Sequence, residues 1–249
     1  MNSGLKQSLA GGLGGAVLAL VLVFAAAELG YLPTNSAAIH DYLVTHPEIL
    51  VDMTTRLQAN QDAQVENERQ AAVTKLGTKA FFDPKVAFIT GPANAKVTMT
   101  EFYDYDCPYC RASLPAVKKF YETHKNAVRF SFIELPIPQL HGPSAVLAAR
   151  ASVAAAHQPD KFVAFHFALM GEDDVITEDT IYADARKAGL DVEKLKADMA
   201  DSSVDLAVAA ANTLARAAKL DGTPAFIVNG RVREGALDDK SLAKMLKAT

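Results

Sequence analysis

The sequence predicts an α/β fold in which a strand–helix–strand unit is followed by a large helical insertion, a β-hairpin and a closing helix. Three observations predict it. Two segments rich in β-forming residues, 96–103 and 127–135, flank a helical pattern over 107–124. Residues 144–220 are almost wholly helical and rich in alanine. Two short strand patterns then follow, separated by Asn-Gly, a hairpin turn dipeptide.

The first element, residues 1–33, does not resemble a globular core. Lys6 is the only charge before Glu28, and "AVLALVLVFAAA" is strongly apolar. Such a segment exports the chain that follows. Two interpretations stay open: a signal peptide cleaved after the alanines at 25–27, or a membrane anchor over residues 9–27, which as a helix just spans ~30 Å of hydrocarbon. Either way we expect the remainder to work outside the cytoplasm, where dithiols meet oxidants.

The second element, residues 36–77, should be helical. A short helix is expected over 36–44 and a long one over 46–76. Thr45, followed three residues later by Glu48, predicts a capping box at the start of the long helix.

The long helix becomes too polar after its first turns to be held by its own packing face. It is therefore either a solvated spacer or one half of a seam between chains. The apolar residues available for such an oligomer are Ile39, Leu43, Leu50, Met53 and Leu57.

The third part, residues 81–249, is predicted to form the domain proper. Because a helix joins strands 96–103 and 127–135, these two strands should run parallel. The expected elements are, in order, a strand over 86–89, a turn at Gly91-Pro92, a strand over 96–103, a helix over 107–124, a strand over 127–135, the insertion over about 140–220, a strand and return strand joined by Asn229-Gly230, and a helix over 238–247.

Charge excludes one class of partner. The formal net charge is −4, and no run of Lys and Arg occurs anywhere in the chain. We therefore expect no nucleic-acid binding, which depends on a basic surface.

The two cysteines of the chain, Cys107 and Cys110, lie in "EFYDYDCPYC". C-x-x-C close to a strand–helix–strand pattern is the thioredoxin-like redox signature. Cys107 falls at the start of a helix, where free backbone N–H groups favour a thiolate, and Pro108 fits the first turn. Cys110 follows one turn later, so Cys107 should attack substrate and Cys110 should resolve the mixed disulfide.

Other uses of two cysteines fit less well. A disulfide that closes so short a loop restrains the unfolded chain very little. A closed zinc site needs four ligands, and no histidine has a matching spacing. We therefore expect no metal and no cofactor beyond a reversible Cys107–Cys110 disulfide.

Two further positions are candidates for the site. Glu101 has the same strand parity as apolar neighbours, so its carboxyl group should be buried, with a raised pKa, and able to exchange protons. Thr223 and Pro224 precede the hairpin in "GTPAF". If their peptide bond is cis, the loop can present the Thr223 backbone to an extended polypeptide.

Together, "EFYDYDCPYC", the helical insertion, "GTPAFIVNG" and "DYLVTHPEIL" resemble the DsbA-type thiol–disulfide oxidoreductases of the periplasm, in particular the ScsC-like (suppressor of copper sensitivity) branch. The resemblance implies a thioredoxin fold with an inserted helical domain. Cys107 then matches the nucleophile, Cys110 the resolving cysteine and Glu101 the buried acid. Pro108 and Tyr109 match the dipeptide that tunes the redox potential, and Thr223 and Pro224 match the loop that binds substrate.

One departure leaves the direction of electron flow open. The best-known oxidases of the family carry histidine where this chain has Tyr109, which cannot be positively charged. We expect a disulfide oxidase or isomerase that acts on exported cysteine-containing proteins and is reset by a membrane redox partner. The alternatives are an envelope copper- or zinc-binding thiol protein and a membrane-tethered adaptor.

Overall fold

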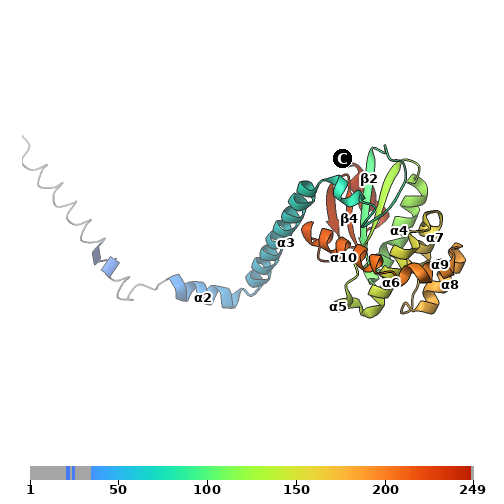
Figure 1. Ribbon diagram of the computed structural model, residues 1–249. Helices are drawn as coiled ribbons and strands as arrows, with labels where there is room; N and C mark the ends of the chain where they lie inside the picture. Colours follow the sequence, from blue (N-terminus) through green and yellow to red (C-terminus); the bar gives the residue numbers. More distant parts are fainter. Residues whose placement is uncertain (1–20, 23, 26–34, 248–249) are drawn as a thin grey trace, which may run out of the picture. The chain divides into compact units, whose positions relative to one another are not determined.

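The computed structural model describes residues 21–22, 24–25 and 35–247 (Figure 1). The expected export or anchor segment therefore lies almost wholly outside the described residues. Within these ranges, no helix is both long and apolar enough to cross a membrane. The chain divides into two compact units, with the boundary between Ala63 and Gln64.

The first unit contains α2 (Asn35–Thr45) and the beginning of α3 (Glu48–Leu76). Its large apolar side chains are exposed: Ile39, Tyr42, Leu43, Val44, Leu50, Val51, Met53 and Leu57. The predicted capping box is wrong. The Thr45 hydroxyl donates backwards to the carbonyl oxygens of Asp41 (2.8 Å) and Tyr42 (3.1 Å), as threonine does inside a helix.

The end of α3 belongs to the second unit, which begins earlier than residue 81. Val73 is buried in one of its two apolar clusters. The Arg69 guanidinium lies 2.7 Å from a Glu234 carboxylate oxygen. The Gln70 side chain donates to the Gly230 carbonyl oxygen (2.7 Å) and accepts from the Val232 N–H (3.1 Å), so it holds the hairpin turn.

The second unit is built on one five-stranded sheet in the order β1-β3-β2-β4-β5. The strands are β1 (Phe88–Thr90), β2 (Val97–Tyr103), β3 (Val128–Glu134), β4 (Ala225–Val228) and β5 (Arg231–Glu234). As predicted, β2 and β3 are parallel, and the other neighbours are antiparallel. Asn229 and Gly230 both have positive φ (47° and 79°), as a two-residue hairpin turn requires.

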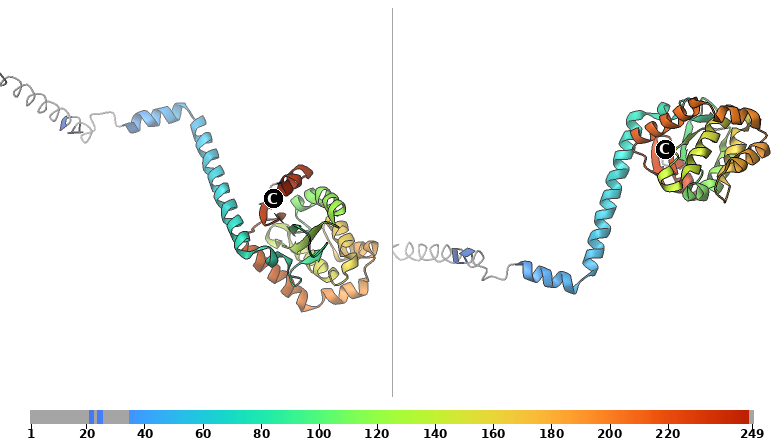
Figure 2. Two further views of the ribbon diagram at one scale, coloured as in Figure 1. Left: turned by 90° about the horizontal axis from the view of Figure 1, so that it is seen from above. Right: turned by 60° about the horizontal axis from the view of Figure 1, so that its bottom comes forward.

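Helices cover both faces of this sheet (Figures 1 and 2). The helices of this unit are α4 (Pro108–His124), α5 (Pro138–His141), α6 (Pro143–Ala155), α7 (Pro159–Met170), α8 (Glu178–Ala188), α9 (Val192–Met199), α10 (Ser202–Ala217) and α11 (Asp239–Lys247). Helices α8 and α9 lie at the end of the unit, against α6 and α7. Met99 and Tyr103 of β2 face the cluster formed with α4, α6 and α7. Phe102 faces the opposite cluster, formed with Val73 and with α10.

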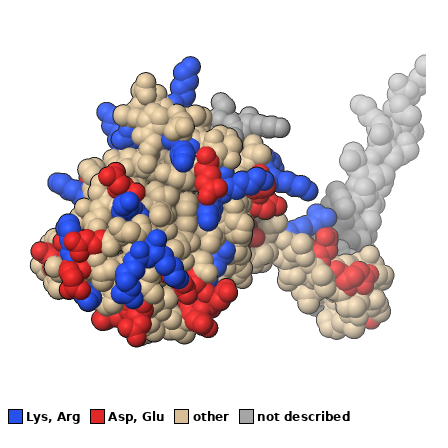
Figure 3. Space-filling view, turned by 90° about the vertical axis from the view of Figure 1, so that its right-hand side faces the viewer, with Lys and Arg blue, Asp and Glu red and all other residues tan. Residues whose placement is uncertain are grey.

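The surface mixes charges of both signs. On the face drawn in Figure 3, Lys and Arg side chains are interspersed with Asp and Glu, and no continuous basic stripe crosses it. The absence of nucleic-acid binding stays a prediction from the charge of the sequence.

Candidate redox site

The Cys-Pro-Tyr-Cys segment lies where β2 has ended and α4 begins. Cys107 is the N-cap residue and Pro108 occupies the first helical turn. The Cys107 N–H donates to the Asp104 carbonyl oxygen (3.1 Å), and the Cys110 N–H donates to the Cys107 carbonyl oxygen (3.1 Å). These bonds fix both cysteines on one helical turn. Both are reduced and buried, with exposed fractions of 2% and 1%.

The Cys107 sulfur is surrounded by groups that stabilise its thiolate. The Cys110 thiol is the strongest of them, and the backbone N–H groups of Tyr109 and Cys110 add to it. Together they lower the pKa of Cys107 to about 5. As a thiol, Cys107 donates to the Thr223 carbonyl oxygen at 3.1 Å. The Thr223 side chain adds to the lowering of the Cys107 pKa, and the partial burial of the sulfur opposes it without cancelling it.

Cys110 has the opposite character. Burial raises its pKa well above the ordinary value, and the neighbouring Cys107 and Glu101 raise it further. At neutral pH the pair is therefore one thiolate beside one thiol, the asymmetry that thiol–disulfide exchange requires.

The loop before β4 faces the cysteines. The Thr223–Pro224 peptide bond is cis. Pro224 accepts a hydrogen bond from the Gly235 N–H (2.8 Å), which ties the loop to the end of the hairpin. Thr223 thus lies against Cys107, where the sequence placed a candidate substrate-binding residue. The Tyr109 ring, 65% exposed, points away from the buried core.

Glu101 lies on β2, six residues before Cys107. It is 4% exposed, and burial alone raises its pKa to about 8. One of its carboxyl oxygens has no hydrogen-bond partner among the described residues. The burial that strand parity predicted is confirmed, and the role of Glu101 in proton exchange stays a prediction.

The turn before Cys107 is held by groups that the sequence did not single out. The buried Asp104 carboxylate accepts hydrogen bonds from the Ile137 N–H (2.8 Å) and the Asp106 N–H (2.9 Å), and it contacts the His141 ring at 2.7 Å. It therefore connects the turn to the start of the helical insertion at α5.

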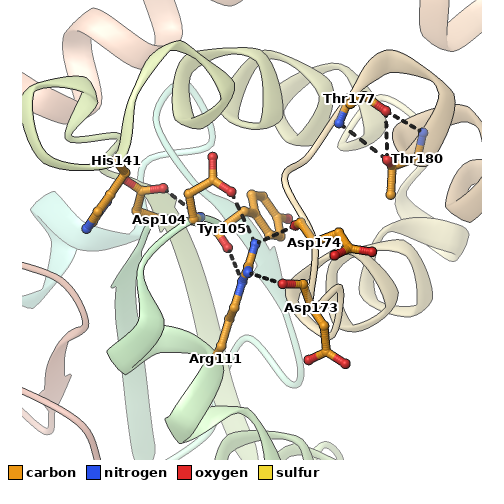
Figure 4. Close-up of polar contacts among 9 residues, drawn as sticks. Asp104, Tyr105, Arg111, His141, Asp173, Asp174, Thr177 and Thr180 are labelled. Atoms are coloured by element: carbon orange, nitrogen blue, oxygen red, sulfur yellow. Dashed lines mark hydrogen bonds and ion pairs between the residues drawn. The ribbon is translucent and has the colours of Figure 1, made fainter.

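Arg111, directly after Cys110, provides a second connection (Figure 4). Its guanidinium donates to the Tyr105 carbonyl oxygen (2.8 Å) and to the Asp106 carboxylate (3.1 Å). It also donates to the carbonyl oxygens of Asp173 and Asp174, both at 3.4 Å. One side chain thus links the active-site turn to the α7–α8 loop.

A buried polar network connects β2 and the turn after it with α6 and α7. The Ser152 hydroxyl contacts the hydroxyls of Tyr103 (3.0 Å) and Tyr105 (3.1 Å), and the latter contacts the His166 ring at 2.9 Å. Burial lowers the pKa of His166 to about 3, so the ring is neutral. Ser152 also forms part of the wall of a cavity of about 650 Å³ beside β1, which the cysteines do not line.

Glu134 was not predicted as a site residue. It ends β3 beside this network, and burial raises its pKa well above the ordinary value, with Asp104 and Glu101 adding to the effect. It has the same strand parity as the buried Phe130 and Phe132, so the signal that indicated Glu101 was present here too.

Two protein families match the chain. The family described as thioredoxin matches residues 83–248. The family described as the N-terminal domain of the copper resistance protein ScsC matches residues 36–64. These matches confirm the resemblance that the motifs indicated.

Solved structures with this fold include three informative neighbours. A thioredoxin-like oxidoreductase from Silicibacter pomeroyi is 35% identical, with a TM-score of 0.61 over 69% of this chain and 96% of that chain. A periplasmic thioredoxin-like protein from Salmonella enterica is 30% identical, with a TM-score of 0.58 over 68% and 92%. BcfH of Salmonella enterica is 25% identical, with a TM-score of 0.70 over 90% and 98%.

Curated relatives that the chain matches include Na(+)/H(+) antiporters called NhaA. One from Salinispora tropica is 32% identical over 161 residues, which is 65% of this chain and 24% of the antiporter. The chain therefore spans about a quarter of the length of these relatives.

Proposed function

The chain belongs to the thioredoxin family, and from that premise we propose that it is a thiol–disulfide oxidoreductase acting on cysteine-containing polypeptides through Cys107 and Cys110. The observation that carries the proposal is the difference between the two thiols. The pKa of Cys107 is lowered to about 5, whereas that of Cys110 is raised. At neutral pH a nucleophilic thiolate therefore lies beside a thiol that holds its proton.

In the oxidising direction, the protein takes two electrons from the substrate in two exchange steps. A substrate thiolate attacks the Cys107 sulfur of the Cys107–Cys110 disulfide and forms a mixed disulfide. The bond between the two cysteines breaks, and the Cys110 sulfur takes the electron pair and a proton from Glu101. A second substrate thiolate then displaces Cys107 as a thiolate. The substrate has lost two electrons and the protein has gained them, so no cofactor is needed.

Stabilisation of the Cys107 thiolate also bears on the direction in which electrons flow between the protein and its substrate. A lowered pKa stabilises Cys107 only when the disulfide is open, and so favours the reduced protein and donation of disulfides to substrates. This supports an oxidase that a membrane redox partner would reset. Equilibration of the protein with glutathione buffers, with thiols counted by alkylation and mass, tests the direction. A potential as low as that of thioredoxin would contradict it.

Substitution of each cysteine tests the assigned roles. With a dithiol peptide and oxidised protein, wild type should produce peptide disulfide. With reduced protein and a peptide disulfide, Cys107→Ser should show no exchange, while Cys110→Ser should accumulate a mixed disulfide at Cys107. Full exchange by Cys107→Ser would overturn the assignment. Failure to reduce insulin and to reactivate scrambled ribonuclease would overturn the proposed function itself.

The first unit supports a further part of the proposal, self-association. Its exposed apolar residues include Leu50, Met53 and Leu57, spaced three and four residues apart on α3. Exposed apolar surface of this kind indicates a partner. An oligomer would hold several redox sites around one substrate, so that the reduced protein would also rearrange incorrect disulfides, in addition to the oxidation that the Cys107 thiolate favours. The charge-poor N-terminal segment supports export to the periplasm, as a signal peptide or an anchor.

A second candidate function is copper or zinc binding by the thiols. The match of residues 36–64 to a family named for copper resistance favours it, and thiolates select Cu(I). Competition with a Cu(I) chelator separates the two functions. Tight binding together with absent disulfide exchange would favour this alternative.

A further inference from the structure

Glu134 is a buried carboxyl group that the exchange steps above do not use. In the parallel ladder of β2 and β3, Glu134 pairs with Tyr103 and Glu101 pairs with Phe132. Paired residues project from the same face of a sheet, as do residues two apart on one strand. The two carboxyl groups are therefore diagonal neighbours on the face that α4 and α6 cover.

Neither carboxyl group has a charged partner in the described part of the chain. Both oxygens of Glu134 and one oxygen of Glu101 are buried without a hydrogen bond, and each residue is 4% exposed. A carboxylate without a partner is far less stable here than the neutral acid. Ionisation of either residue also makes ionisation of the other harder. At neutral pH this site therefore holds neutral acids.

The groups around the pair carry protons but no positive charge. The titratable groups that face it, or lie one hydrogen bond beyond, are Tyr103 of β2, Asp104 and Tyr105 of the next turn, His141 of α5, His166 of α7 and Cys110 of α4. Helix α6 contributes only Ser152. Burial, together with Asp104 and Glu101, keeps the pKa of Glu134 well above the ordinary value although the hydroxyls of Ser152 and Tyr103 lower it. Glu101, whose pKa burial raises to about 8, has no such contact.

We propose that Glu134 and Glu101 act as a carboxyl pair that holds the proton exchanged with Cys110, with Glu134 as a reserve donor. When the Cys110 thiolate leaves the disulfide, Glu101 gives it a proton. Where Glu101 is already ionised, the proton held by Glu134 passes through Glu101 to the Cys110 thiolate, because the pKa of Cys110 is also raised well above the ordinary value. Glu134 does not touch the cysteines, so it is a positioning residue that acts through Glu101. This inference rests on the proposed oxidoreductase function.

The test is the pH dependence of one chemical step. Oxidised full-length protein is mixed with a dithiol peptide, and the rate at which peptide disulfide forms is followed from about pH 6 to about pH 9.5. In Glu134→Gln, Glu101 alone must supply the proton, so the rate should fall from about pH 8, near the pKa of Glu101. At about pH 9 the variant should be roughly tenfold slower than wild type, because only about a tenth of Glu101 stays protonated.

Two variants control the comparison. Glu134→Asp keeps an acid at this position. Its rate above about pH 8, the alkaline limb of the pH–rate profile, should therefore equal that of wild type. Asp184→Asn alters another buried carboxyl group, far along the chain on α8 and paired with Lys187, and should leave the limb in place.

The inference is overturned if the Glu134→Gln profile coincides with that of wild type, or if Glu134→Asp fails to restore the limb. Should Glu134→Gln fail to fold, infrared spectra of the wild type and Glu101→Gln replace it. Wild type must then show two protonated buried carboxyl groups at neutral pH and Glu101→Gln one; any other count overturns the inference. A wild-type protein inactive at every pH would refute the proposed function instead.

Discussion

The substitution Glu101→Gln is predicted to change how stability depends on pH. Glu101 is buried, and its pKa rises from 4.5 to about 8 on folding. Between these two values the folded state keeps a proton that the unfolded state has lost. The unfolded state therefore binds fewer protons, and the free energy of unfolding falls as pH rises through this window. Below pH 4.5 and above pH 8 Glu101 does not make the free energy of unfolding depend on pH.

The size of the effect follows from the shift. One pKa unit corresponds to about 1.36 kcal/mol. Glu101 should therefore reduce the stability of the wild type by about 3 kcal/mol at pH 7 and by about 5 kcal/mol above pH 8. Glutamine has nearly the same size and does not ionise, so the variant loses this pH dependence of the free energy of unfolding. Its unpaired amide adds an offset of about 1–3 kcal/mol that does not vary with pH.

Urea unfolding of the reduced protein, followed by circular dichroism near pH 4.5, 6, 7 and 8, measures the difference. The free energy of unfolding of Glu101→Gln, relative to wild type, should increase by about 3 kcal/mol between pH 4.5 and pH 7. Glu122→Gln, on the exposed side of α4, is the matched control and should run parallel to wild type. A Glu101→Gln curve that also runs parallel would refute the reasoning.

Three other outcomes are expected. Arg111→Ala should lower kcat/KM roughly tenfold by releasing the turn before Cys107, with partial recovery in Arg111→Lys; an unchanged kcat/KM contradicts the positioning role. Gly91→Ala should destabilise the protein by about 3 kcal/mol in chemical unfolding, because its φ is +86° and a Cβ would lie 2.1 Å from the Val128 carbonyl oxygen. Leu50→Glu combined with Leu57→Glu should lower the sedimenting mass to that of a monomer; an unchanged mass rules out α3 as the seam.

The sheet could be predicted because its determinants are local. Strand periodicity, the helix between β2 and β3, and the Asn229-Gly230 turn each act within a few residues of themselves. Parity likewise indicated that Glu101 is buried. The same parity on β3 indicates that Glu134 is buried, so the sequence carried a local signal for the second acid as well.

The other features depend on distant partners. Arg69 donates to the Lys219 carbonyl oxygen, 150 positions later, and Gln70 donates to that of Gly230 in the hairpin turn, 160 positions later. The polar sequence of α3 therefore gave no sign of packing. Arg111 binds carbonyl oxygens of Asp173 and Asp174, and a backbone acceptor leaves no residue type to recognise. The isomer of the Thr223–Pro224 bond also depends on tertiary context.

Tyr109 was the reason to leave the direction of electron flow open, because it cannot carry the positive charge of a histidine. The stabilising groups at Cys107 explain how the thiolate forms without one. They are the Cys110 thiol and backbone N–H groups, including that of Tyr109 itself, and a backbone donor persists whatever the side chain is. The Tyr109 ring is therefore free to face solvent, where an incoming polypeptide can contact it. Nucleophilicity at Cys107 thus depends on the start of α4, whereas proton delivery to Cys110 depends on the buried acids behind it. Substitutions at Tyr109 should accordingly affect substrate affinity more than the pKa of Cys107.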